Sequence, residues 1–337
     1  MGAGIVEVSE RAGVSRMTVS RVMRGQTSVS VETRRLVLKA VEELGCVPSA
    51  NARAMRSKDA LLATGSLCCG LIFGGGTKTA DSFFSTIAQA AEEEAAKHGL
   101  SLLQSHWEED FALAWPRLRA MFGVSGMCGA VLAGQFKRKE IQAIGQYTRN
   151  IVILDGPAPA GGAIASVEGD YFAGSVLAID HLVGGGAKNI LVITGPYTQH
   201  YFAKAMTAAA KSEVRSGVKV EVMCADMTPQ SGYEIVKKLC NEGMQFDGIF
   251  CNDELAIGAL RALAEMKVRV PKDVKVVGFD DIAHAAFTNP SLTTVSIDKA
   301  QIGREAVNTL VSIVRGKVDE VNMKKVVKAN LVVRESA

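Results

Sequence analysis

Apolar residues near the start of the chain recur at helical spacing within residues 6–24. The recurring positions are Val8, Ala12, Val19, Val22 and Met23. Because residues three or four apart share one face of a helix, this pattern predicts two short amphipathic helices. Gly13 fits a tight turn between them, since glycine adopts a positive φ without a Cβ clash. Val14 is predicted to fill the space between the helices, and Ser15 to cap the second one.

The second helix begins with basic and small hydroxyl side chains. Its candidate DNA-contacting residues are Ser15, Arg16, Met17, Thr18, Ser20 and Arg21. A short helix that presents Arg and hydroxyl groups from its N-terminal end can enter the major groove of DNA and read base edges. The alternative is an ordinary helical hairpin with a solvated basic face.

A third helical stripe follows, with a predicted cap at Ser30 and a stop at Gly45. Its apolar positions are Val37, Ala40, Val41 and Leu44. Three helices around a small core predict a compact head over residues 1–47. Residues 48–58 are Ala-rich and compatible with a helix that is too short to be stable alone.

From Leu67 the pattern changes to apolar strand-like runs that alternate with amphipathic helices. The predicted strands are 69–73, 100–104, 130–133, 151–154, 190–194, 219–223, 248–251 and 274–279, and the predicted helices are 82–98, 171–183, 201–215, 230–242 and 253–266. Two βα arrays in series predict that residues 59–337 form two doubly wound α/β subdomains with a ligand cleft between them. Pro116 is expected to start or kink a helix.

Composition agrees with this α/β architecture. The chain has 337 residues, is 48% hydrophobic and has a mean hydropathy of +0.16, which suits parallel sheets buried on both faces. Its net charge of +3 is unevenly distributed, because residues 1–58 hold ten Lys and Arg against five Asp and Glu. This basic segment coincides with the predicted head, where phosphate contacts would need positive charge. A solvated charged face is the alternative.

Several classes of protein are disfavoured. Seven cysteines, an odd number, argue against a disulfide framework. No Cys-x-x-Cys occurs and the five His are scattered, so no metal site and no cofactor are predicted. The first twenty residues lack an apolar signal-peptide region, and no run approaches the eighteen apolar residues of a membrane span. The sequence therefore predicts a cytoplasmic protein with no membrane partner.

Longer strings of the chain resemble a known family. These strings are Ala12-Gly13-Val14-Ser15, Thr18-Val19-Ser20-Arg21-Val22, Phe250-Cys251-Asn252-Asp253, Ala256-Ile257-Gly258-Ala259, Pro271-Lys272-Asp273-Val274, Val277-Gly278-Phe279-Asp280-Asp281-Ile282 and Asn289-Pro290-Ser291-Leu292-Thr293-Thr294-Val295. They resemble the LacI/GalR (lactose-repressor) family over roughly residues 5–335. The resemblance implies an all-α helix-turn-helix head and a core similar to periplasmic sugar-binding proteins. In this core, residues 59–337, two interleaved α/β subdomains would bind an effector and mediate dimerisation.

The same resemblance implies that residues 48–58 form a hinge helix. In the family, two such helices from a dimer dock in the minor groove of DNA, and an apolar side chain wedges between base pairs. Ala52 and Met55 are the candidate contacts here, with Met55 in the place where the family usually carries Leu. Methionine is among the wedge residues of minor-groove binders. The alternative is a plain linker.

Polar residues follow three of the predicted strands. Asp155, Asn252 and Asp280 each end a strand, and the resemblance places all three at effector-contacting positions. Carboxylates and amides suit the hydroxyl groups of a polyol. Each could instead be a helix cap or a turn residue, and Asp253 fits a capping role best, since it opens a predicted helix.

The chain departs from the family pattern at several positions. The family commonly carries an Arg that clamps the effector shortly after Gly195-Pro196, but residues 197–206 contain none. Lys204 lies near the expected place, and a lysine is a point charge that cannot reproduce a bidentate fork. Ile297 and Lys299 replace the Gln or aromatic residue often found there, and Gly4 replaces a capping Thr or Ser.

Glycine-rich segments do not support an enzymatic function. Residues 74–79 lack the Gly before Lys-Thr that a Walker loop needs, and residues 184–186 lead from a helix into a strand, the wrong order for a dinucleotide fingerprint. A sugar-processing enzyme on this fold would also leave the head unexplained.

The sequence therefore predicts a transcriptional regulator, read as a repressor, that acts as a homodimer or a dimer of dimers. It binds a near-palindromic double-stranded DNA operator and is controlled by a small-molecule effector, a sugar or sugar acid. The alternative function is a small-molecule sensor of the periplasmic-binding-protein type without functional DNA binding.

Overall fold

The computed structural model describes residues 5–23, 30–44, 67–74, 82–107, 110–156, 158, 164–195, 201–212, 217–316 and 324–337. The chain forms two compact units, Met1–Ala63 and Thr64–Ala337. We call the helical part of the first unit the head and the second unit the core, and each is described by itself.

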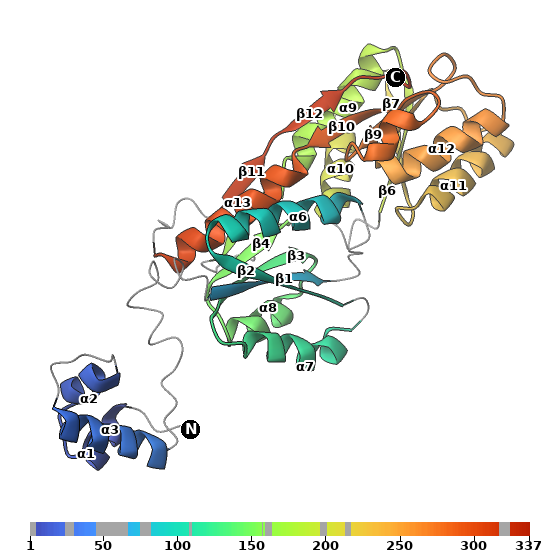
Figure 1. Ribbon diagram of the computed structural model, residues 1–337. Helices are drawn as coiled ribbons and strands as arrows, with labels where there is room; N and C mark the ends of the chain where they lie inside the picture. Colours follow the sequence, from blue (N-terminus) through green and yellow to red (C-terminus); the bar gives the residue numbers. More distant parts are fainter. Residues whose placement is uncertain are drawn as a thin grey trace. The chain divides into compact units, whose positions relative to one another are not determined.

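The head contains helices α1 (Ile5–Ala12), α2 (Arg16–Met23) and α3 (Val31–Glu43), coloured blue in Figure 1. Its buried cluster consists of Val8, Val19, Val22, Val37 and Ala40, with Ala12, Val14 and Leu44 packed against it. Gly13 adopts φ 63° in the turn between α1 and α2. The predicted helix-turn-helix and the third helix are confirmed.

The core contains two six-stranded sheets. The first has the order β11-β5-β4-β3-β1-β2 and the second the order β12-β10-β9-β8-β6-β7. Their strands are β1 (Leu67–Gly74), β2 (Leu100–His106), β3 (Met127–Gly134), β4 (Ile151–Leu154), β5 (Ala165–Gly169), β6 (Asn189–Thr194), β7 (Lys219–Cys224), β8 (Gly248–Cys251), β9 (Lys275–Phe279), β10 (Thr293–Ile297), β11 (Lys324–Val327) and β12 (Ala329–Val332). The β10–β12 pair is antiparallel, and the other pairs of the two sheets are parallel.

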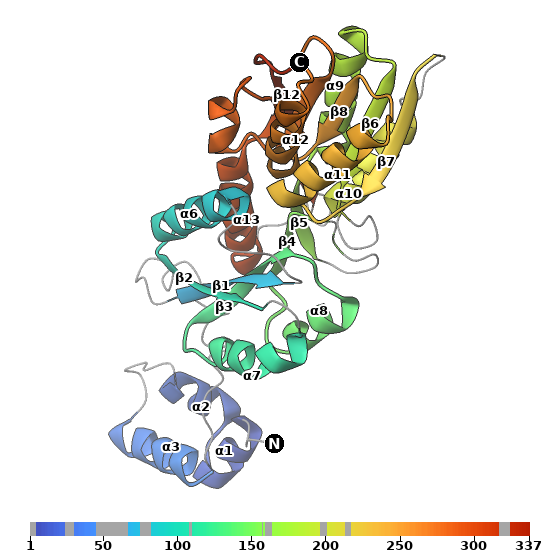
Figure 2. The same cartoon turned by 90° about the vertical axis from the view of Figure 1, so that its right-hand side faces the viewer.

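Helices cover both faces of each sheet, as Figures 1 and 2 show. The helices are α6 (Ser82–Lys97), α7 (Phe111–Phe122), α8 (Arg138–Gly145), α9 (Tyr171–Gly184), α10 (Tyr201–Ser212), α11 (Pro229–Asn241), α12 (Asp253–Glu265) and α13 (Lys299–Val314), with a short 3-10 helix, η1 (Ala283–Phe287). On the first sheet, α7 and α8 pack on one face and α6 and α13 on the other. On the second sheet, α11 and α12 lie opposite α9 and α10.

The two subdomains are interleaved, as predicted. The first consists of the first sheet with α6, α7, α8 and α13, and the second of the second sheet with α9 to α12. The chain passes between them three times, through Asp170 from β5 to α9, Asp298 from β10 to α13, and Lys328 from β11 to β12. The last part of the chain returns to the first sheet before it ends in the second.

Pro116 does not start a helix. It lies inside α7, which begins at Phe111 with Asp110 as its cap, and the Asp110 side chain accepts a hydrogen bond from Ala112 N. The cap fixes the start of the helix upstream of the proline. Buried Ala114, Leu118 and Phe122 then hold α7 against the sheet, which offsets the backbone hydrogen bond that a proline cannot donate.

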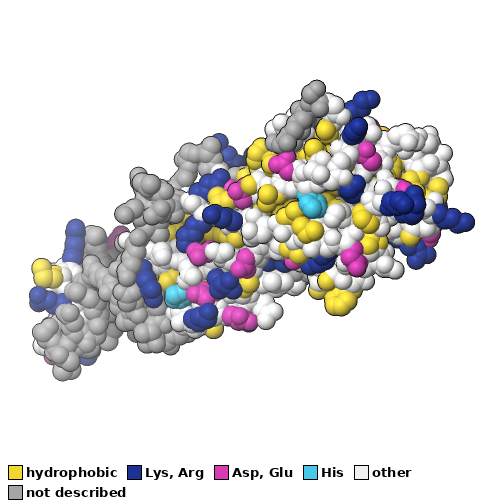
Figure 3. Space-filling view, turned by 90° about the horizontal axis from the view of Figure 1, so that it is seen from above, with side chains coloured by type: hydrophobic (Ala, Val, Ile, Leu, Met, Phe, Trp, Pro, Cys, Tyr) yellow, Lys and Arg dark blue, Asp and Glu magenta, His cyan; other side chains and the backbone are white. Residues whose placement is uncertain are grey.

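No helix in the described part of the chain is long and apolar enough to cross a membrane. Within the same residues no group of three His, Cys, Asp or Glu side chains is arranged to hold a metal ion. Acidic and basic side chains are interspersed over the face of the core in Figure 3.

Candidate DNA-reading and effector sites

The start of α2 is fixed by two hydroxyl groups. Ser15 Oγ accepts a hydrogen bond from Thr18 N at 3.1 Å, which confirms Ser15 as the cap of α2. Ser15 Oγ and Thr18 Oγ1 are also hydrogen-bonded at 2.9 Å. The first of these bonds satisfies the Thr18 N–H, which has no partner within the first turn of the helix.

Exposed side chains on α2 form the candidate reading surface. Arg16 and Arg21 are exposed, and Met17 is 61% exposed. The Arg21 guanidinium lies 3.5 Å from Met17 Sδ, one helical turn away, so the two side chains lie together on the surface. The side chain of Ser20 and residues Arg24, Ala52 and Met55 lie outside what the structure describes.

Asp155 lies where β4 ends, at the carboxyl edge of the first sheet. It is half-buried, its backbone has φ 63°, and its N–H donates to Val167 O of β5 at 2.8 Å. A non-glycine residue in this left-handed region is uncommon and is held in place by its surroundings. The end of the strand therefore fixes the backbone that carries this carboxylate.

Asn252 and Asp280 lie at the carboxyl edge of the second sheet, after the neighbouring strands β8 and β9. Asn252 is 7% exposed and caps α12, with its Oδ1 accepting from Leu255 N at 3.1 Å. The expectation that Asp253 serves as the cap is wrong. The helix begins at Asp253, so the preceding residue is the one whose side chain reaches the free N–H groups.

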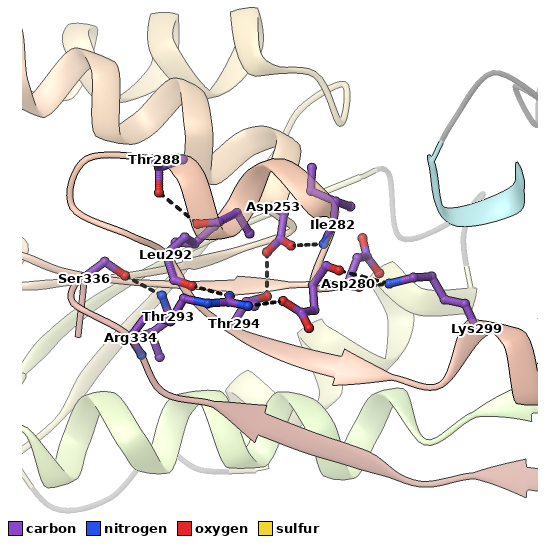
Figure 4. A network of polar contacts seen from close by, with 12 residues as sticks. Asp253, Asp280, Ile282, Thr288, Leu292, Thr293, Thr294, Lys299, Arg334 and Ser336 are labelled. Atoms are coloured by element: carbon purple, nitrogen blue, oxygen red, sulfur yellow. Dashed lines mark hydrogen bonds and ion pairs between the residues drawn. The ribbon is translucent and has the colours of Figure 1, made fainter. Parts of the chain in front are cut away.

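Asp253 has a different role, which Figure 4 shows. Its fully buried carboxylate accepts from Thr294 Oγ1 at 2.6 Å and from Ile282 N at 2.8 Å. Burial raises the pKa of Asp253 to about 7, although both hydrogen bonds act to lower it. A Cβ on Gly278 would lie 2.0 Å from Asp253 Oδ1, so this arrangement requires glycine on β9. Asp253 thus ties the loop after β9 to strand β10.

The loop after β9 has strained backbone at two consecutive residues. Asp280 has φ 106° and Asp281 has φ 47°. Such conformations cost roughly 1–3 kcal/mol each and persist where neighbouring contacts over-determine them. Asp280 N donates to Val295 O at 2.8 Å, the Asp281 carboxylate pairs with Arg334 at 2.7 Å, and the Lys299 ammonium donates to the carbonyl oxygens of both aspartates.

The carboxyl edges of the two sheets meet at the crossings of the chain. The chain leaves the first sheet at the carboxyl end of β5 and returns to it from the carboxyl end of β10. A Cβ on Gly169, the last residue of β5, would lie 2.6 Å from Ile297 Cδ1 at the end of β10. The topology thus brings the edge that carries Asp155 toward the edge that carries Asn252 and Asp280.

Aromatic rings line the second sheet near this junction. Tyr171 packs against Phe202 and Phe279, with ring centroids 5.3 and 5.9 Å apart, and Phe202 lies 4.7 Å from Phe279. Lys204 lies in the first turn of α10 and is exposed. The structure thus places the predicted cation on the helix that carries Phe202.

Sequence reasoning missed Glu168, which is 2% exposed in β5, two residues before the Asp170 crossing. Its carboxylate forms an ion pair with Lys324 of β11. The pKa of Tyr201 in α10 is raised, chiefly by burial and secondly by Glu168, so this carboxylate also faces a residue of the other subdomain. An acidic residue in an otherwise uncharged strand was the available signal.

Comparisons with known proteins agree with this architecture. Residues 4–49 match the family described as bacterial regulatory proteins, lacI family, and residues 179–337 match the periplasmic binding protein-like domain. The HTH-type transcriptional repressor PurR of Pasteurella multocida (strain Pm70) is 29% identical over 324 residues, which cover 94% of each chain. PurR of Salmonella typhi is 30% identical over 325 residues, which cover 94% of this chain and 92% of that protein.

Two solved structures share the fold over nearly the whole chain. The Lac repressor dimer bound to operator and the anti-inducer ONPF has a TM-score of 0.69 and 26% identity, and the match covers 100% of this chain and 99% of that one. The complex of the transcriptional regulator CelR with cellobiose has a TM-score of 0.70 and 25% identity, with 99% and 100% coverage.

A helix-turn-helix head attached to a core of two interleaved α/β subdomains defines a class of ligand-responsive regulators. The chain belongs to the lacI family of bacterial regulatory proteins.

Proposed function

We propose that this chain is a sequence-specific, DNA-binding transcriptional repressor whose affinity for its operator is set by a small-molecule effector. The observation that carries the proposal is the exposed face of α2, which presents Arg16, Met17 and Arg21 from a capped helix of the right size for a major groove. Ser15, Thr18 and Ser20 would contact the adjacent phosphates and bases. Such a function would place the chain in the cytoplasm.

The operator would be a near-palindrome read by a homodimer, alone or as a dimer of dimers. The related Lac repressor was solved as a dimer bound to operator, which supports this assembly. Ala52 and Met55, in residues 48–58, would contact the minor groove at the centre of the site and kink the duplex.

The effector would bind between the two subdomains and contact Asp155, Asn252 and Asp280. A ligand that touches residues from both sheets favours one relative orientation of the subdomains, which is how binding can be linked to the DNA-binding state. The cellobiose complex of CelR supports a sugar or a sugar acid. Lys204 would add affinity for an anionic group.

Selection of duplex DNA from a random pool by the full-length protein tests the DNA-binding part. We expect a near-palindromic site, bound by a dimer in sedimentation experiments and bent at its centre. Met55→Gln should abolish the bend and weaken this site far more than random DNA. A protein that enriches no sequence, yet gains thermal stability from a sugar, would instead be a sensor without DNA binding.

A thermal-shift screen of sugars, sugar acids and nucleobases tests the effector part. A true effector should raise the melting temperature and change operator affinity at the same concentration, because ligand binding stabilises the state it prefers. Wild-type affinity of such a ligand for both Asp155→Asn and Asp280→Asn variants would place the effector elsewhere.

A further inference from the structure

Lys299 is an unfavourable residue for the place it occupies in α13. It opens this helix directly after the capping residue Asp298, and a cation near a helix N-terminus opposes the helix dipole. Helix stability therefore does not explain a lysine here. Its ammonium instead donates hydrogen bonds to the main-chain oxygens of Asp280 and Asp281, the latter at 3.2 Å (Figure 4).

The helix that carries Lys299 is packed into the first subdomain. It contacts α6 and strands β3, β4 and β5. At Gly303 its backbone approaches α6 so closely that a Cβ would lie 2.3 Å from Ile87 O. Close-packed backbones of this kind transmit displacement rather than absorb it. A rotation of the first subdomain therefore carries α13 and the position of Lys299 with it.

The loop that Lys299 holds belongs to the second subdomain. Three of its restraints come from that subdomain: Val295 O accepts from Asp280 N, Asp253 accepts from Ile282 N, and Arg334 pairs with Asp281. Lys299 adds hydrogen bonds to the same loop from α13, which is part of the first subdomain. It holds the carbonyls of the two residues whose φ values are positive.

We infer that Lys299 is a positioning residue that links the orientation of the first subdomain to the backbone of Asp280, the candidate effector contact. Asp298 alone separates β10 from α13, so a turn about its backbone bonds moves the Lys299 side chain relative to the loop. The inference rests on the proposed function, because it supplies a route between the effector site and the DNA-binding state. Ligand or DNA binding that changes the orientation of the subdomains would therefore also change the hydrogen bond between Lys299 and the Asp280 carbonyl.

Amide hydrogen exchange in the full-length, DNA-free protein gives the first test. The variants are Lys299→Met, which keeps the stem and removes the donors, and Lys299→Arg, which restores donors. Lys328→Met is the matched control, because Lys328 also stands at a crossing and is exposed. We expect exchange at Asp281 and Ile282 to quicken roughly tenfold in Lys299→Met, to return toward wild type in Lys299→Arg, and to stay unchanged in the control.

Operator DNA, obtained by selection as above, gives the second test. Binding of the duplex should change exchange at the same two amides in the wild type. In Lys299→Met this change should be lost while operator affinity stays within about threefold. Thermal unfolding of all three variants shows whether the fold is intact.

The results separate the two hypotheses. Wild-type exchange at Asp281 and Ile282 in the DNA-free Lys299→Met variant would overturn the inference, and so would an equal response of both proteins to operator. Failure of the wild type to select any duplex would contradict the proposed function instead, and exchange in the DNA-free variants would still decide whether Lys299 holds the loop.

Discussion

On α2, Met17 is the residue whose side chain gives the most specific prediction about the operator sequence. Its side chain is apolar, is exposed on the helix predicted to enter the major groove, and lies against the Arg21 guanidinium. In that groove the feature that an apolar side chain recognises is the 5-methyl group of thymine. The operator half-site should therefore contain a thymine opposite Met17.

Replacing single thymines of the selected operator by deoxyuridine should reveal this contact. At one position per half-site, the replacement should weaken binding of the wild-type protein. The Met17→Gln variant should bind equally well with or without that methyl group, and should bind the original operator roughly 1–3 kcal/mol more weakly than the wild type. Fluorescence anisotropy titrations measure both. Leu36→Gln, at an exposed apolar residue on α3, is the control and should leave the thymine dependence intact.

Asp253 predicts a particular dependence of stability on pH. Its pKa is raised by burial to about 7 in the folded protein, above its value in the unfolded chain. A group of this kind favours the fold fully below its unfolded pKa, and the benefit is lost as the pH rises through the folded pKa. A shift of about three pKa units corresponds to roughly 4 kcal/mol, so the free energy of unfolding should fall between about pH 4 and pH 7.

Urea unfolding of the full-length protein over this pH range measures the effect. Thr294→Val should raise the pKa of Asp253 further, because the Thr294 hydroxyl favours its ionised form. Asp253→Asn should remove most of the pH dependence in this window. At low pH the substitution should change stability little, since the amide oxygen can accept from Ile282 N while the amide nitrogen donates to Thr294 Oγ1. An Asp253→Asn variant with the full wild-type slope would assign the titration to another group.

At the scale of elements, glycines on α12 and α13 determine how closely helices pair. A Cβ on Gly258 would lie 1.8 Å from Pro229 O of α11, and one on Gly303 would lie 2.3 Å from Ile87 O of α6. These contacts are between backbones, so no side chain can move aside. The close packing of each helix pair therefore requires a glycine, without a Cβ, at the point of contact.

Gly303→Ala should destabilise the core, because α13 must move away from α6 or the helices must bend. We expect a loss of about 1–3 kcal/mol in denaturant unfolding, the usual cost of overpacking. Gly184→Ala, in the last turn of α9, meets no atom within 4 Å and should be neutral or stabilise the protein by up to about 1 kcal/mol. Equal effects of the two substitutions would show that α6 and α13 are not closely packed.

The hydrophobic pattern predicted most elements because buried parallel strands are apolar on both faces. Strands 151–154 and 248–251 have the predicted bounds, and the others that were predicted differ by a few residues at their ends. It missed β5, whose Glu168 interrupts the apolar pattern, and β11, which contains Lys324 and Lys325. It also missed strands β10 and β12 and helices α8 and α13. β11 is an edge strand, where polar residues are common because part of the strand faces solvent. β5 is an interior strand that is buried throughout, and its Glu168 is accommodated by the ion pair with Lys324.

The positions of Asp155, Asn252 and Asp280 at strand ends could be read from the sequence, but their partners could not. Asp253 bonds to Thr294, 41 residues away, and Lys299 holds carbonyls 18 and 19 residues earlier. Such contacts depend on strand order and on the crossings, which periodicity does not encode. The sequence therefore assigned the cap of α12 to Asp253 instead of Asn252, because the first residue of a helix cannot be located to within one position from sequence alone.

At the scale of the whole molecule, three single-residue crossings connect the two subdomains. Asp170 and Asp298 have ψ values of 69° and 89°, and each caps the helix that follows it with its side chain. Because single residues connect the subdomains, we expect that a backbone change at these residues would reorient one subdomain without unfolding either sheet. Lys328 is the third single residue that connects the two sheets.

Asp280→Asn should uncouple the effector from operator binding. Asparagine tolerates positive φ, so the loop should keep its shape while the carboxylate charge is removed. With an effector identified by thermal shift, the wild type should change its operator affinity by a coupling free energy of about 1–3 kcal/mol. In Asp280→Asn we expect that coupling to fall below about 0.5 kcal/mol, while affinity for the operator without effector stays at the wild-type value.

Operator titrations with and without the effector, combined with calorimetry of effector binding, separate the possible causes. Weak effector binding together with lost coupling indicates that Asp280 contacts the ligand. Asp273→Asn, at a carboxylate whose pKa is lowered to about 2 by its exposed Arg269 partner in the same subdomain, is the control and should respond as the wild type does. Full coupling in Asp280→Asn would mean that closure of the two subdomains is driven by contacts other than this strand end.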